Sequence, residues 1–134
     1  MSGQEWVIEA HGCDPSALAD GDRLRALFTR LIEALDLHPV SEPVWHQFPR
    51  TGGLTGLCLL AESHLACHTF PEYRSLCLNL FCCRPRPEWD FAGCLEQGFA
   101  ATSVRVRRIE RPYQNELENC ELPELRSPDP VSVV

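Results

Sequence analysis

The spacing of hydrophobic residues in the first third of the chain predicts a strand followed by an amphipathic helix. Trp6 and Ile8 stand among polar residues within residues 4–11, a pattern typical of a strand. Asp14 and Pro15 then have the residue types favoured at a helix N-cap and at the first helical position. The helix that follows has one apolar stripe with spacings of three and four residues, formed by Leu24, Leu27, Phe28, Leu31, Ile32 and Leu35.

Two β-hairpins are predicted in the middle of the chain. Each consists of two β-favouring segments joined by a short run of turn-forming residues. The segments are residues 43–48 and 54–61 around a turn at 49–53, and residues 64–70 and 75–82 around a turn at 71–74.

A second helix and a last strand are predicted next. The helix opens at Pro87 and Glu88 and has one apolar face, formed by Phe91, Cys94, Leu95 and Phe99. The strand contains Val104, Val106 and Ile109.

The order strand, helix, four strands, helix, strand predicts an α+β fold. Each helix has one apolar stripe to bury and a sheet offers a matching face, so we expect a two-layer sandwich of an antiparallel β-sheet with two α-helices on one face. The opposite sheet face must meet water or another subunit. We expect residues 1–111 to form a single domain and residues 112–134, which are acidic and proline-rich, to form an unstructured tail.

Composition argues against several classes of function. No apolar run approaches the roughly 18 to 20 residues that span a bilayer, so no membrane role is expected. The net charge is −7 and the longest basic run is Arg107-Arg108, which argues against nucleic-acid binding. The N-terminal residues lack the features of a secretory signal, which predicts a cytoplasmic protein whose eight cysteines are free thiols, most of them in the core.

All twelve basic residues are arginine, and the chain contains no lysine. A pyridoxal phosphate enzyme holds its cofactor as a Schiff base on a lysine. Pyridoxal phosphate chemistry is therefore excluded, and chemistry on an amine substrate would need a carbonyl group on the protein itself.

Residues 60–73 concentrate side chains that can carry chemistry, and three interpretations compete. The first is a metal site, but His64 and His68 on a strand would lie about 13 Å apart, too far to share one ion, so no metal is predicted. The second is a hydrolase that uses Ser63 and a neighbouring histidine, but the Gly-x-Ser-x-Gly elbow is absent. The third is that these residues only pack within a strand.

A series of motifs around Ser63 supports a fourth interpretation. The motifs are Ala61-Glu62-Ser63-His64, His68-Thr69-Phe70-Pro71-Glu72-Tyr73 and Phe81-Cys82-Cys83-Arg84, preceded by Gly12-Cys13-Asp14, His46-Gln47-Phe48 and Leu54-Thr55-Gly56. Over roughly residues 5 to 111 this series resembles the short, bacterial and archaeal type of S-adenosylmethionine decarboxylase proenzyme. That family has Ala-Glu-Ser-His, then His-Thr-Trp-Pro-Glu-Tyr, then Phe-Thr-Cys-Gly.

The resemblance implies that the chain cuts itself between Glu62 and Ser63. The serine hydroxyl attacks the preceding carbonyl, and elimination frees the chain end and leaves a pyruvoyl group in place of the serine. The expected cofactor is thus covalent and self-derived from Ser63. By analogy His68 removes the Ser63 α-proton, and Thr55 takes the place of a serine that assists the acyl shift.

The resemblance also implies the reaction, the decarboxylation of S-adenosylmethionine to the aminopropyl donor of spermidine biosynthesis. Cys83 would return a proton to the α-carbon, because a thiol with an ordinary pKa near 8.5 is mostly protonated at pH 7. Phe48 and Phe70 would stack on the adenine and face the sulfonium, and Glu72 would hold the ribose hydroxyls. Sites of this family form between two protomers, so a homodimer of cleaved chains is expected.

Four positions depart from the family pattern around the substrate. Phe70 stands in place of tryptophan, Asn79 in place of aspartate, Gln47 in place of lysine, and Arg84 in place of the glycine after the catalytic cysteine. Asn79 and Arg84 permit a second hypothesis, a pyruvoyl-dependent decarboxylase of arginine or ornithine. A third hypothesis is an unprocessed binding or regulatory homologue.

Overall fold

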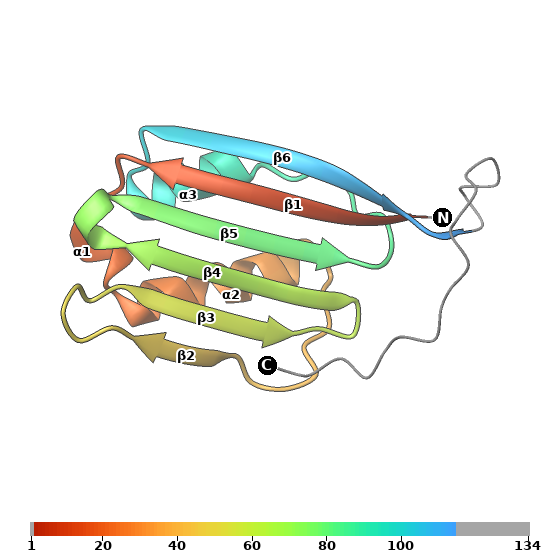
Figure 1. Cartoon of the computed structure of the whole chain (residues 1–134), viewed down its shortest axis with the longest axis horizontal. Helices are drawn as coiled ribbons and strands as arrows, with labels where there is room; N and C mark the ends of the chain where they lie inside the picture. The colour runs from red at the N-terminus through yellow and green to blue at the C-terminus, as the bar shows by residue number, and fades with distance from the viewer. Residues whose placement is uncertain (1, 115–134) are drawn as a thin grey trace, which may run out of the picture.

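The computed structural model describes residues 2–114, and its elements are shown in Figure 1. The strands are β1 (Ser2–His11), β2 (Val44–Gln47), β3 (Leu54–Leu59), β4 (Ser63–Phe70), β5 (Ser75–Cys82) and β6 (Ser103–Pro112). The helices are α1 (Pro15–Leu18), α2 (Gly21–Ala34) and α3 (Phe91–Phe99), and a 3-10 turn, η1 (Pro71–Tyr73), joins β4 to β5. Within the described residues no helix is long and apolar enough to cross a bilayer.

The six strands form one antiparallel sheet in the order β2-β3-β4-β5-β1-β6. The predicted hairpins are β2–β3 and β4–β5, while β1 lies between β5 and β6. All helices cover the same face of the sheet (Figure 1). The predicted α+β sandwich is therefore confirmed, with three helices rather than two in the part of the chain that the structure describes.

Alternation along the strands separates a covered face from an open face. In β5, Leu76, Leu78 and Leu80 are buried against the helices, while Cys77 and Asn79 point to the open face and are partly exposed. The core between the sheet and the helices is apolar, and its largest fully buried side chains are Phe28, Phe99, Ile8, Leu18, Leu24, Leu31, Leu65, Leu76, Leu80 and Leu95. Five of the seven cysteines in the described residues are buried thiols, as predicted; Cys120 lies outside those residues.

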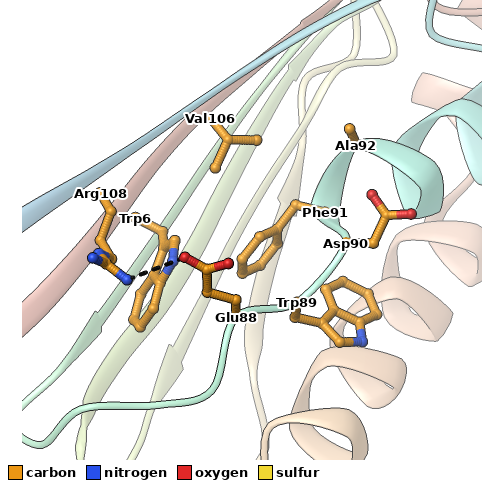
Figure 2. A pocket seen from close by; sticks show the side chains of 8 residues that line it. All are labelled: Trp6, Glu88, Trp89, Asp90, Phe91, Ala92, Val106 and Arg108. Atoms are coloured by element: carbon orange, nitrogen blue, oxygen red, sulfur yellow. Dashed lines mark ion pairs between the residues drawn. The ribbon is translucent and has the colours of Figure 1, made fainter.

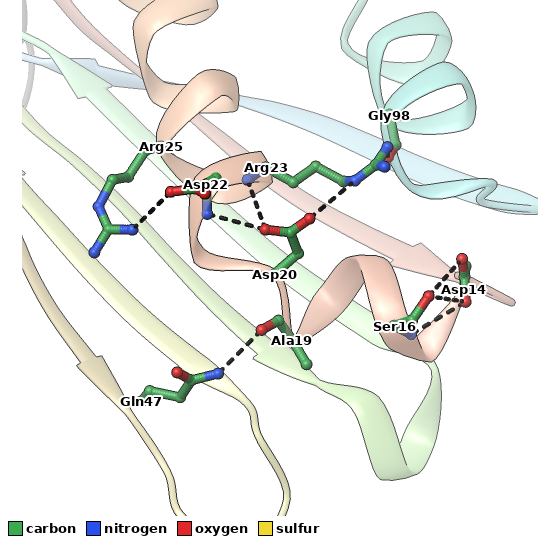
Figure 3. Close-up of polar contacts among 9 residues, drawn as sticks. All are labelled: Asp14, Ser16, Ala19, Asp20, Asp22, Arg23, Arg25, Gln47 and Gly98. Carbon is green, nitrogen blue, oxygen red and sulfur yellow. Dashed lines mark hydrogen bonds and ion pairs between the residues drawn. The ribbon is translucent and has the colours of Figure 1, made fainter.

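The long helix predicted after Asp14 is in fact two helices. Asp14 caps α1 as expected, but Asp20 accepts hydrogen bonds from the main-chain N–H groups of Asp22 and Arg23 and so starts α2 (Figure 3). Aspartate is a strong N-cap, and Gly21 has low helix propensity. The prediction of one continuous helix was wrong because the apolar stripe on which it rested begins only at Leu24, after this break, and therefore could not locate the start of the helix.

Helix α3 begins later than predicted, at Phe91 rather than at Pro87. Asp90 caps it by accepting a hydrogen bond from the N–H of Gly93 at 2.9 Å. The segment before the cap lies over the edge of the sheet near β6 and forms a hollow of about 460 Å³ (Figure 2). The ring of Trp6, 6.2 Å from that of Phe91, lies in this hollow on the helix side of the sheet.

Candidate active site

The predicted scissile bond, between Glu62 and Ser63, lies in the turn that joins β3 to β4. Strand β3 ends at Leu59, and Ser63 is the first residue of β4. The turn is closed by a hydrogen bond from the Leu60 N–H to the Ser63 carbonyl at 3.0 Å. The Glu62 carbonyl accepts a hydrogen bond from the main-chain N–H of Cys83 at 2.9 Å. The predicted proton donor, Cys83, therefore lies beside the predicted scissile carbonyl.

The backbone of Ser63 is unusual. Its φ of +156° lies in a region that residues with a side chain rarely adopt. The other non-glycine residues with positive φ in the described chain, Asp36, Arg74 and Ala100, have values of +51°, +50° and +58°, which are those of ordinary left-handed turns. Strain of this kind is therefore found at Ser63 alone among residues 2–114.

A chain of hydrogen bonds begins at His64, the residue after Ser63, and crosses the open face. His64 Nε2 lies 2.8 Å from Asn79 Oδ1, and Asn79 Nδ2 donates to Glu5 Oε2 at 2.8 Å. Arg111 donates to Glu5 Oε1 at 2.6 Å. The hydrogen bond from Asn79, and then the guanidinium of Arg111, hold the pKa of Glu5 below its usual value, although desolvation opposes this. An aspartate at position 79 could not donate to Glu5, so the departure at this position suits its neighbour.

Thr55 and His68, the two predicted processing residues, are in contact. The register of β3 and β4 pairs them, and Thr55 Oγ1 lies 3.1 Å from His68 Nδ1. The adjacent residue Thr69 fixes this end of β4, because its hydroxyl donates to the Leu18 carbonyl at 2.7 Å and accepts from the Leu54 N–H at 2.8 Å.

The predicted substrate-binding residues surround one cavity beside this pair. Phe48, Phe70 and Glu72 line a hollow of about 490 Å³ together with Thr55 and His68. Both aromatic side chains are accessible, with exposed fractions of 46% for Phe48 and 38% for Phe70. The cavity therefore offers two ring faces and a carboxylate to a ligand.

The predicted site residues form two clusters at opposite ends of β4. Five residues along a strand separate Ser63 from His68, a distance of about 16 Å at ~3.3 Å per residue. Cys83, one residue beyond the end of β5, lies at the Ser63 end. Because proton transfer needs heavy atoms within about 3 Å, or one bridging water, His68 and Thr55 are out of reach of Ser63 in the same chain.

Gln47, like Asn79, departs from the family pattern and has a plain structural explanation. Gln47 Nε2 donates to the Ala19 carbonyl at 3.0 Å and to the Gly52 carbonyl at 3.1 Å (Figure 3 shows the first contact). It thus ties the β2–β3 hairpin to the link between α1 and α2. Arg84 is exposed and makes no ion pair within residues 2–114.

Within residues 2–114, no three histidine, cysteine, aspartate or glutamate side chains converge as metal ligands would. His64 and His68 both lie on the open face. They are four residues apart along β4, which is about 13 Å at ~3.3 Å per residue, so they cannot share one ion. Cys67 faces the core, where burial raises its pKa to about 12. The thiol of Cys67 is thus protonated near neutral pH.

Several contacts near Ser63 were not predicted. The hydroxyl of Tyr113 donates to the Cys83 carbonyl at 2.5 Å, although this tyrosine falls within the predicted tail, whose residues from 115 onward lie outside the described chain. His38 and Arg86 contact the carboxylate of Glu62. No motif or periodicity marks these residues, because each contact joins segments distant in sequence.

Comparison with known proteins places these features in context. The model of the family described as S-adenosylmethionine decarboxylase matches residues 4–112, a range that includes both clusters. The S-adenosylmethionine decarboxylase proenzyme of Thermococcus kodakarensis is 33% identical over 118 residues, covering 87% of this chain and 80% of that protein. The proenzyme of Pyrococcus abyssi is 30% identical over 118 residues, covering 87% and 83%.

A solved structure has the same fold. The crystal structure of the adenosylmethionine decarboxylase from Aquifex aeolicus superposes with a TM-score of 0.71 and covers 84% of this chain and 92% of that one. The two sequences are 22% identical, so this likeness concerns the arrangement of the sheet and helices.

Proposed function

This chain belongs to the S-adenosylmethionine decarboxylase family, and we propose that it is a proenzyme that cuts itself between Glu62 and Ser63 and then decarboxylates S-adenosylmethionine. The observation that carries the proposal is the hydrogen bond from the Cys83 N–H to the Glu62 carbonyl. This hydrogen bond gives the proposed scissile carbonyl a main-chain donor that can stabilise an oxyanion, and the residue that follows this carbonyl, Ser63, has a strained backbone. The product would supply aminopropyl groups for spermidine biosynthesis in the cytoplasm.

Cleavage begins with attack of Ser63 Oγ on the carbonyl carbon of Glu62. The new C–O bond replaces the C–N bond, and the hydroxyl proton passes to the freed amine, so an ester links the two residues. Loss of the Ser63 α-proton then breaks the Cβ–O bond of the ester, and the electron pair leaves with the new carboxylate of Glu62. Water hydrolyses the dehydroalanine that remains at residue 63, which releases ammonia and leaves a pyruvoyl group.

The Cys83 N–H stabilises the first of these steps. Negative charge develops on the Glu62 carbonyl oxygen as Ser63 attacks, and this oxygen already accepts the Cys83 hydrogen bond at 2.9 Å. A fixed donor at a developing oxyanion contributes on the order of 3 kcal/mol to such reactions. Because the donor is a main-chain group at the end of β5, it is in place before the chain reacts.

His68 and Thr55 act on the Ser63 of a second copy of the chain. If two chains pack open face to open face about a twofold axis that runs across the strands, the Ser63 end of one β4 lies over the His68 end of the other. The open face is suited to such burial, since Val44, Leu57 and Leu59 are 70%, 53% and 59% exposed. A homodimer of this kind would contain two complete sites.

The pyruvoyl group supplies an electrophilic carbonyl that takes up the substrate amine and accepts the electrons released with carbon dioxide. Phe48 and Phe70 stack on the adenine and attract the sulfonium, and Glu72 accepts hydrogen bonds from the ribose hydroxyls. The Cys83 thiol returns a proton to the substrate α-carbon. The absence of lysine agrees with this chemistry, because no pyridoxal phosphate could be held.

Intact mass spectrometry of the purified protein tests the first half of this proposal. We expect fragments of residues 1–62 and 63–134, with the second fragment labelled by phenylhydrazine at its ketone. A chain that stays uncut and unlabelled would overturn it. Release of carbon dioxide from carboxyl-labelled S-adenosylmethionine, compared with labelled arginine and ornithine, tests the substrate, and release from only the last two would refute S-adenosylmethionine.

A further inference from the structure

The side chain of Glu62 is buried and is held by several polar contacts. Only 9% of it is exposed, yet its carboxylate accepts hydrogen bonds from the His38 N–H at 2.9 and 3.1 Å and lies 2.9 Å from His38 Nδ1. A guanidinium nitrogen of Arg86 lies 3.5 Å from its other side. A buried carboxylate is costly unless it is paired and hydrogen-bonded, so these contacts fix its position.

Arg86 is itself held in place. Pro85 and Pro87 flank it and restrict its backbone, and its main-chain N–H donates to Gln4 Oε1 at 3.1 Å. Its side chain is 19% exposed, and its Nε–H is buried with no acceptor within residues 2–114. The guanidinium therefore keeps a donor to offer the second carboxylate that cleavage would create at Glu62.

We propose that Arg86 and His38 are positioning residues for self-cleavage, which act through the carboxylate of Glu62. This inference rests on the proposed cleavage between Glu62 and Ser63. Two anchors then hold the residue that is attacked: the Cys83 N–H fixes its carbonyl, and Arg86 with His38 fixes its side chain.

Anchoring of this kind speeds attack because orientation decides the rate of an intramolecular reaction. Ser63 Oγ must approach the carbonyl carbon of the residue before it, and a shift of about 1 Å can cost on the order of a hundredfold in rate. Loss of the Glu62 anchor would let the carbonyl turn away from the Cys83 N–H. Neither Arg86 nor His38 is assigned contact with the reacting atoms.

The test measures the rate of cleavage after a pulse of labelled cysteine in cell-free synthesis, since both fragments contain cysteine. We expect Arg86→Gln and Glu62→Gln each to slow cleavage about tenfold, equivalent to ~1.4 kcal/mol. His38→Ala should slow it less, since the main-chain N–H remains. The matched control is Arg108→Gln, which breaks an ion pair of the same 3.5 Å length with the exposed Glu88.

A double variant separates positioning from a general loss of structure. If Arg86 acts through Glu62, Arg86→Gln combined with Glu62→Gln should slow cleavage about tenfold, as each single change does, whereas independent effects would multiply to about a hundredfold. Free guanidinium ion at millimolar concentration should restore part of the rate to Arg86→Ala. Melting temperatures of the variants, measured in the Ser63→Ala background where no chain is cut, should stay close together.

The outcomes distinguish this inference from the proposed function. If the unaltered chain is never cut, the proposed function fails. If the unaltered chain is cut and Arg86→Gln and Glu62→Gln are each cut as fast as the unaltered chain, the inference is overturned. It is also overturned if the two changes together slow cleavage about a hundredfold. Should Arg86→Gln fail to fold, Glu62→Gln and the guanidinium rescue of Arg86→Ala decide it: cleavage at the unaltered rate in the first, or no rescue in the second, overturns it.

Discussion

Two inactive variants of this chain should repair each other when they form mixed dimers. Ser63→Ala removes the nucleophile but keeps His68, and His68→Ala keeps the nucleophile. Each variant alone should neither be cut nor release carbon dioxide. Because Ser63 and His68 lie about 16 Å apart along one strand, a complete site would take one residue from each chain.

The size of the effect follows from the arrangement of the sites. Equal amounts of the two variants that pair at random form about one half mixed dimers. Each mixed dimer has one complete site, with Ser63 from the His68→Ala chain and His68 from the Ser63→Ala chain, and one site that lacks both. About one quarter of all chains should therefore be cut, every one of them a His68→Ala chain, and activity should reach about one quarter of the unaltered level.

Co-expression with tags of different mass, followed by intact mass spectrometry and a carbon dioxide assay, measures both numbers. The control pairs Ser63→Ala with a chain that carries both changes, and this mixture should yield no fragments. Absence of cleavage in the co-expressed variants, while each is folded and dimeric, would refute a site shared between chains. Full cleavage of His68→Ala on its own would refute the role given to His68.

Four further outcomes are expected. Leu57→Asp combined with Leu59→Asp should weaken the dimer about a thousandfold in sedimentation experiments, because two half-exposed leucines on each of two chains forgo ~1 kcal/mol of burial apiece. Thr55→Val should slow cleavage about tenfold, since the contact with the histidine ring is lost, as gel analysis of a labelled pulse can show. Cys67, with its pKa raised to about 12, should resist iodoacetamide at pH 8 in the folded protein and react in urea, as peptide mass spectrometry can establish. The pKa of Glu5 is lowered in the folded protein, so its carboxylate stabilises the fold fully above the unfolded pKa near 4.5. This stabilisation is lost as the pH falls through the lower pKa of the folded state. Glu5→Gln should therefore flatten the acid side of a plot of melting temperature against pH.

The sheet could be predicted from the sequence because alternation is a local property. In β5 every second residue is apolar and buried, and the same is true of β1 at Trp6, Ile8 and Ala10, so the strands and their open face follow from the pattern itself. The break between α1 and α2 could not be found in this way. The apolar stripe begins only at Leu24, after Asp20, so it does not record the break, and the cap made by Asp20 shows where the second helix starts.

The candidate site also has a part that could be predicted from local sequence and a part that could not. The motifs gave Ser63, His68 and Cys83 as site residues, and the structure adds that the Cys83 N–H is hydrogen-bonded to the Glu62 carbonyl, a contact that the motifs did not predict. Residues in a strand are ~3.3 Å apart, however, so the step of five residues from Ser63 to His68 places His68 near the far end of β4. Contacts such as those of Arg86 depend on where two loops meet, and no local pattern records that.

A cut between Glu62 and Ser63 would divide the sheet into two interlaced halves. The first fragment would hold β1, β2 and β3, and the second would hold β4, β5 and β6. Strand β1, however, lies between β5 and β6 and pairs with them over eight and ten positions. A strand of the first fragment is therefore hydrogen-bonded on both edges to strands of the second. Neither piece could depart without melting the centre of the sheet. Because of this strand order, the molecule would lose a covalent bond on cleavage and keep its shape.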